Sequence, residues 1–105
     1  MKGSYTNMKS ATPRPVARAR RDIAANLSLA RRQQRVSVVV LADRTAVSAP
    51  TISKLLNRGE GTLETFLRVA MTLGLLDGVV DATDPLATPL GRILAEEDVP
   101  QRVRY

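Results

Sequence analysis

The chain is 105 residues long, carries a formal net charge of +6 and contains neither Cys nor His. This composition excludes disulfides, thiolate metal sites, a cysteine nucleophile and the usual general base, leaving Asp, Glu and Lys as the common catalytic groups. We therefore expect no enzyme, no metal and no cofactor. No apolar run approaches the ~20 residues that span a bilayer, and residues 1–15 lack the apolar segment of a secretory signal. We expect a cytoplasmic protein without membrane contact.

Positive charge is concentrated in one part of the sequence. Residues 15–58 hold nine Lys or Arg against two Asp, whereas residues 59–105 hold four Arg against eight acidic residues. A basic segment of this kind is typical of a surface that binds phosphates. A solvated basic helix is the alternative, because most charge runs lie on a surface without a ligand.

The start of the chain predicts an arm followed by a long helix. Residues 1–14 are polar and show no apolar period, so we expect a disordered basic arm there. From Pro15 to Arg35 the composition favours a helix with arginine on its solvent faces. Its expected apolar stripe consists of Val16, Ile23, Leu27 and Ala30.

Two short helices are expected next. Ser37 is placed to cap a helix over Val38–Thr45, and Ser48 to cap a second helix from Ala49 to about Asn57. The second helix ends before Gly59, since glycine readily takes the left-handed conformation that closes a helix.

The spacing of small and apolar residues joins these helices into a helix-turn-helix. With Ala42 as the close contact between the helices, the turn falls at Ala46 and Val47. Ile52 and Leu55 then follow at the i, i+3 spacing that faces one core. This motif indicates DNA binding, and with it an association with the nucleoid.

A fourth and a fifth helix complete the expected domain. Thr62 is placed to cap the fourth helix and Gly74 to stop it, and its expected buried stripe is Leu63, Phe66, Leu67, Ala70 and Leu73. The apolar segment Leu75–Val80 predicts a short fifth helix or turn. Dimer contact and ordinary core are equally open interpretations of that segment.

Residues 81–105 are expected to form a C-terminal extension with a helical piece from Leu90 to Glu97. The end of the chain is basic and partly apolar, which suits docking on another protein, while a frayed terminus is the plain alternative. The predicted docking residues are Arg102, Val103, Arg104 and Tyr105.

The stretch from Ile23 to Leu76 resembles the XRE family, the Cro/CI-type helix-turn-helix domains of bacterial and phage repressors. The resemblance is carried by LADRTAVSAPTISKLLNRG followed by TLETFLRVAMTLGL. It implies an all-α chain with a compact five-helix, lambda-repressor-like DNA-binding domain over residues 15–80. A flexible N-terminal arm precedes this domain, and the C-terminal extension follows it.

The resemblance also implies which residues bind DNA. Its recognition helix enters the major groove with positions that match Ala49, Pro50 and Lys54 here. Lys54 is the expected polar base contact, since lysine can donate to the two acceptors of guanine. The family's phosphate contacts match Arg31, Ser37, Thr51, Asn57 and Arg58.

Four positions depart from the family pattern. Many members have glutamine at the position of Val38 and glycine at the positions of Arg35 and Ala46. Many also pair the equivalent of Arg31 with an acid, where this chain has Leu56. With one polar base-reading side chain, DNA shape is expected to contribute to specificity.

Within this family, the C-terminal third of the chain resembles HipB-like antitoxins. The features that carry this resemblance are LGLLDGVV, an Asp-Pro loop and a terminal P-x-R-V-R. This resemblance implies a homodimer on an inverted-repeat operator, which represses its own operon and neutralises a HipA-like kinase toxin. The alternatives are a stand-alone XRE-type phage or bacterial regulator and a protein-interaction adaptor on a helix-turn-helix scaffold. RNA binding is disfavoured, because three aromatic residues offer too few stacking platforms.

Overall fold

A computed structural model describes residues 11–98. Within this range the chain forms six α-helices and a 3-10 turn and has no strand, which confirms the expected all-α class. Contacts divide the chain after Leu73, whereas the boundary expected from the sequence follows Val80. The two parts are therefore described one at a time, as the N-terminal unit (described residues 11–73) and the C-terminal unit (described residues 74–98).

The N-terminal unit starts with α2, a helix of 20 residues over Arg14–Gln33. Pro15 lies in its first turn, where a missing N–H costs no hydrogen bond. Two residues of the helix, Ala24 and Leu27, are buried. The expected stripe is wrong at Val16 and Ile23, which are 49% and 38% exposed. Ile23 borders an open hollow that Leu55 and Gly59 also line, so the packing around it is incomplete.

Both short helices form where the sequence predicts them. α3 spans Val38–Thr45, and the Ser37 hydroxyl accepts a hydrogen bond from the Val40 N–H at 3.1 Å. α4 spans Ala49–Arg58, and the Ser48 hydroxyl accepts from the Thr51 N–H at 3.3 Å. Each hydroxyl satisfies one of the backbone donors that a helix start leaves free.

α5 spans Leu63–Thr72 and is capped by Thr62, as expected. Its buried face differs from the prediction: Leu63 is 70% exposed, whereas Thr65 and Val69 are buried. The first turn of α5 borders an open hollow of about 200 Å³ beside α2 rather than the core, so its leucine faces solvent.

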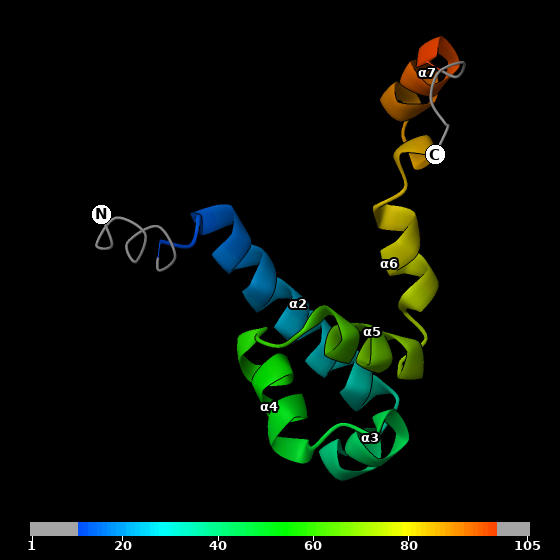
Figure 1. Cartoon of the computed structure of the whole chain (residues 1–105). Helices are drawn as coiled ribbons and strands as arrows, with labels where there is room; N and C mark the ends of the chain where they lie inside the picture. Colours follow the sequence, from blue (N-terminus) through cyan, green and yellow to red (C-terminus); the bar gives the residue numbers. More distant parts are fainter. Residues whose placement is uncertain (1–10, 99–105) are drawn as a thin grey trace. The chain divides into compact units, whose positions relative to one another are not determined.

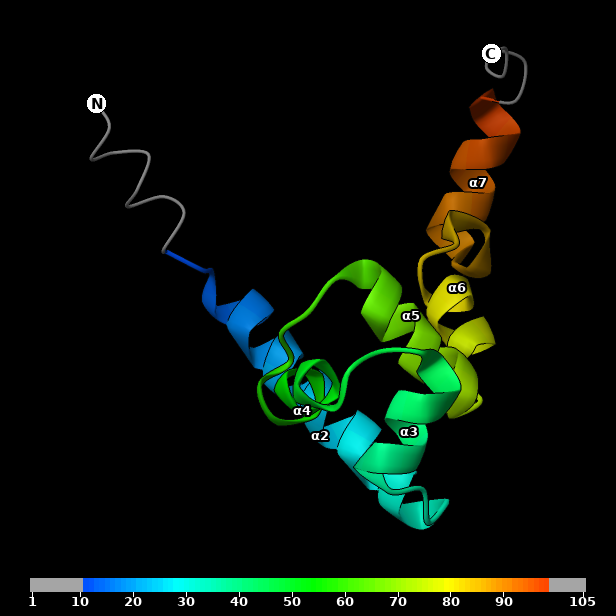
Figure 2. The same cartoon turned by 60° about the horizontal axis from the view of Figure 1, so that its bottom comes forward.

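The core lies where these four helices meet. α4 packs against α2 and α3, and α3 packs against α5 (Figures 1 and 2). Ile52 and Leu55 are buried as predicted, and Ala42 packs against the cluster. The buried cluster consists of Leu27, Val36, Leu41, Ile52, Leu55, Leu56, Val69 and Leu73.

The C-terminal unit consists of α6 (Leu76–Ala82), the 3-10 turn η1 (Pro85–Ala87) and α7 (Pro89–Asp98). No residue of α6 is buried, and whether Leu75–Val80 serves as core or as a dimer contact stays open. α7 includes the helical piece predicted for this region. Among the described residues, no helix has both the length and the apolar character needed to cross a bilayer.

Local hydrogen bonds specify the η1–α7 segment. The Asp84 carboxylate accepts from the Leu86 N–H at 2.9 Å, and the Thr88 hydroxyl accepts from the Gly91 N–H at 3.0 Å. The Arg92 guanidinium donates to the Leu86 carbonyl at 2.8 Å and ties α7 to η1. A β-carbon on Gly91 would clash with the Pro85 carbonyl, so this contact requires glycine.

Candidate nucleic-acid interface

One face of α4 is anchored in the core and the other is open to solvent. Ile52 and Leu55 are at most 4% exposed and fix the rotation of the helix about its axis. Pro50, Lys54 and Asn57, at i, i+4 and i+7, lie on the opposite, exposed face. Lys54 joins none of the ion pairs found within residues 11–98. Its ammonium group is therefore available to an external acceptor.

The other predicted residues of α4 lie at its two ends. At the start, Ala49 and Thr51 are half-buried, and the Thr51 hydroxyl lies 2.8 Å from the Ser48 hydroxyl. At the end, Asn57 and Arg58 are exposed. The Arg58 side chain is 66% exposed and lies 3.8 Å from a carboxylate oxygen of Glu60. Such an exposed, loosely paired guanidinium remains able to bind a phosphate.

Two predicted phosphate contacts lie outside α4. Ser37 is exposed at the start of α3, where its hydroxyl caps the helix. Arg31 is half-buried, and its Nη1 donates to the Val36 carbonyl at 2.9 Å. Its Nε is buried and has no hydrogen-bond partner among the described residues. Arg31 thus holds the connection between α2 and α3, and its phosphate contact stays a prediction.

Leu56 and Val38 stand where the resemblance predicts polar side chains, and both serve the core. Leu56 is 6% exposed, and its carbonyl accepts from the Ser28 hydroxyl at 3.0 Å. Val38 is half-buried against the core cluster. The acid expected as the partner of Arg31 is thus replaced by an apolar contact, and Arg31 bonds to Val36 instead.

The connections on either side of α3 contain two residues in the left-handed conformation. Arg35 has φ 58° and Ala46 has φ 59°, and these are the non-glycine residues with positive φ in the part of the chain described. Both stand where the resemblance predicts glycine. Since this conformation costs an L-residue about 1–2 kcal/mol, the connections before and after α3 are held partly against local strain.

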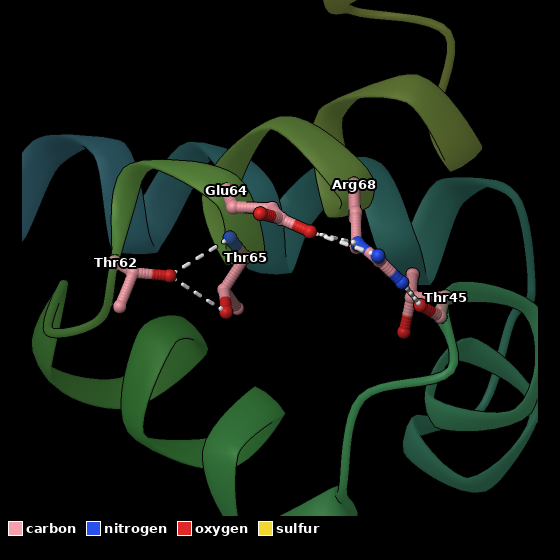
Figure 3. Close-up of polar contacts among 5 residues, drawn as sticks. All are labelled: Thr45, Thr62, Glu64, Thr65 and Arg68. Carbon is pink, nitrogen blue, oxygen red and sulfur yellow. Dashed lines mark hydrogen bonds and ion pairs between the residues drawn. The ribbon is translucent and has the colours of Figure 1, made fainter.

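Arg68 of α5 holds the end of α3, a role that the sequence analysis missed. Its Nη1 donates to the Thr45 carbonyl at 2.9 Å, while Nε and Nη2 donate to Glu64 at 3.1 and 2.8 Å (Figure 3). The i, i+4 pair with Glu64 is visible in the sequence. The contact with Thr45, 23 residues away, leaves no signal in a single sequence. The bond fixes the carbonyl immediately before the turn that leads to α4.

The predicted docking residues Arg102, Val103, Arg104 and Tyr105 lie outside the described residues. Within the C-terminal unit, several large apolar side chains are exposed, among them Val80, Leu86, Leu90, Ile93 and Leu94. Residues 74–98 also contain six acidic residues and one arginine.

Comparisons with protein-family models, with curated proteins and with solved structures gave no match to this chain.

Proposed function

We propose that this protein is a DNA-binding transcriptional repressor of the XRE type, with a lambda-repressor-like domain that binds the major groove. One observation carries the proposal: core residues of α4 fix its rotation so that Lys54 lies on an exposed face. The segment that contains this face has a strong excess of positive charge. A helix held this way can enter the groove without rearrangement of its own core.

In the proposed complex, Lys54 donates to guanine, and Ala49 and Pro50 make apolar contacts such as those with a thymine methyl group. Ser37, Thr51, Asn57 and Arg58 contact phosphates and set the register. Arg31 supports this surface by holding the α2–α3 connection. A homodimer would place two copies of α4 about 34 Å apart on an inverted repeat.

The protein would repress its own operon and act as the antitoxin of a HipA-like kinase toxin. The C-terminal unit supports a protein partner, because its exposed apolar side chains are accompanied by acidic ones. The partner surface that fits this combination is apolar with a basic rim. The same observation favours a second candidate function, an adaptor that binds protein through this unit and uses the helix-turn-helix as a scaffold.

Fluorescence anisotropy with labelled duplex from the adjacent promoter tests the proposal. For 6–10 phosphate contacts, affinity should fall about 10³-fold or more between 50 and 200 mM salt. An adaptor would show no salt-dependent DNA binding, yet it would copurify with the product of the neighbouring gene. That pair of results would reject the repressor in favour of the adaptor.

A further inference from the structure

Three exposed arginines lie near the start of α2, outside the set of residues assigned to DNA so far. Arg14, Arg18 and Arg21 are exposed, and none of them joins an ion pair within residues 11–98. Asp22 lies beside Arg14 and Arg18 in a shallow hollow and offsets part of their charge. The segment Arg14–Arg21 nevertheless carries four arginines and no acid.

Helical spacing places Arg14 and Arg21 near the side of α2 that faces α4. Ser28 marks that side, because its hydroxyl donates to the Leu56 carbonyl of α4 at 3.0 Å. Arg21 and Arg14 precede Ser28 by seven and fourteen residues, which puts them on nearly the same line along the helix. Arg18 lies one turn from Arg14, about 80° around the helix from the Ser28 line, on the adjacent solvent face.

Arg14 and Arg18 lie beyond the C-terminal end of α4, and Arg21 lies level with that end. α4 is followed by Gly59, which packs so closely on the backbone of Arg20 that a β-carbon there would clash with the Arg20 carbonyl. Arg20 itself pairs with Glu60 at 3.3 Å. The turns of α2 before Arg20 therefore continue past the end of α4, as both views show (Figures 1 and 2).

We propose that Arg14, Arg18 and Arg21 bind backbone phosphates of DNA just outside the base pairs covered by α4. This inference rests on the proposed function. Seven residues of helix span about 10 Å, which matches roughly three phosphate steps of one strand at ~3.4 Å each along the duplex axis. Guanidinium groups suit this role because they can donate two hydrogen bonds to one phosphate. The contacts would raise affinity without reading bases.

The test compares Arg21→Gln with the matched variant Arg92→Gln, which removes an arginine from the C-terminal unit. Glutamine and arginine have similar helix propensities, so Arg21→Gln should keep α2. Arg92→Gln also removes the hydrogen bond to the Leu86 carbonyl, so circular dichroism checks the fold of both variants. Anisotropy titrations against salt give the number of phosphate contacts. We expect Arg21→Gln to make the slope of log K against log[salt] shallower by about 0.9 per protomer, and Arg92→Gln to leave it unchanged.

The triple variant R14Q/R18Q/R21Q should make the slope of log K against log[salt] shallower by roughly 2.7 per protomer. Between 50 and 200 mM salt, the triple variant should therefore lose about 40-fold less affinity than the unaltered chain. On a duplex trimmed to the base pairs under α4, the phosphates proposed to bind the three arginines are absent. The unaltered chain and the triple variant should then bind with the same affinity and the same salt slope. Equal slopes for the two chains on the untrimmed duplex would overturn the inference while leaving the proposed function intact. Lack of salt-dependent binding by the unaltered chain would overturn both.

Discussion

Lys54 is the residue on which sequence specificity depends in this account. Replacing it with alanine should cost about 1–3 kcal/mol on the operator, the range for a good base contact, and much less on random DNA. Its side chain is exposed and joins no ion pair within the described residues, so the variant should fold normally. Anisotropy with both duplexes measures the difference.

Arg58→Ala is the matched control for Lys54, because it removes an exposed cation from the same helix. As a phosphate contact, Arg58 should contribute similarly to binding of operator and random DNA. Equal losses on the two duplexes for both variants would contradict the base-reading role of Lys54.

Ala46 is the clearest site of local strain. Ala46→Gly should stabilise the protein by about 0.5–1 kcal/mol, because relief of the left-handed conformation exceeds the extra chain entropy of glycine. The matched control is Ala25→Gly in the helical part of α2, which should destabilise by about 1 kcal/mol. Urea unfolding measures the free energy of unfolding of each variant and shows whether it rises or falls. Loss of stability in both variants would refute the strain assigned to Ala46.

At the scale of elements, Arg68 connects α5 to the end of α3. Arg68→Ala should cost about 1.5 kcal/mol, since the Thr45 carbonyl loses a charged donor. Glu64→Gln removes the exposed ion pair but keeps that donor, and should cost less than about 0.5 kcal/mol. Thermal unfolding of both variants checks the order. A larger loss for Glu64→Gln would assign the stability to the ion pair instead.

In the η1–α7 segment, replacing a glycine with alanine should have an effect opposite to the one that helix propensity predicts. Alanine at Gly91 would clash with the Pro85 carbonyl, whereas alanine at Gly78 in α6 meets no atom within 4 Å. Gly78→Ala should therefore raise helix content and Gly91→Ala should disrupt the end of the chain, although propensity alone favours both by about 1 kcal/mol. Hydrogen exchange of the α7 amides measures this. Stronger protection in Gly91→Ala would contradict the close contact.

The helices and the exposed face of α4 could be predicted from the sequence because their signals are local. Ser37, Ser48 and Thr62 cap helices within three residues, and Ile52 and Leu55 follow one helical period. The bond from Arg31 to the Val36 carbonyl was not predicted, and the phosphate contact of Arg31 stays a prediction.

The features that could not be predicted depend on how the helices pack and on where one helix ends beside another. Val16, Ile23 and Leu63 follow the right period but are exposed, and Ile23 and Leu63 border one open hollow. The contact of Arg68 with Thr45 requires the packed helices to be known. The period of apolar residues shows which face of a helix is apolar, but it does not show how far the neighbouring helix extends along that face.

For the whole molecule, the account predicts two surfaces of opposite character on one chain. The N-terminal unit carries a basic surface that includes the exposed face of α4. The C-terminal unit carries acidic residues beside exposed apolar ones. The first surface is the one that we propose binds DNA, and the second is the one that we propose binds a protein partner.

The most direct test of the central claim is to map the operator onto the chain by NMR. Titration of the isotope-labelled protein with promoter duplex should shift the amide resonances of Lys54, Asn57 and Arg58 most strongly, together with those at the start of α3. Shifts confined to residues 74–98, or no shifts at any duplex concentration, would contradict the claim that the outer face of α4 binds DNA.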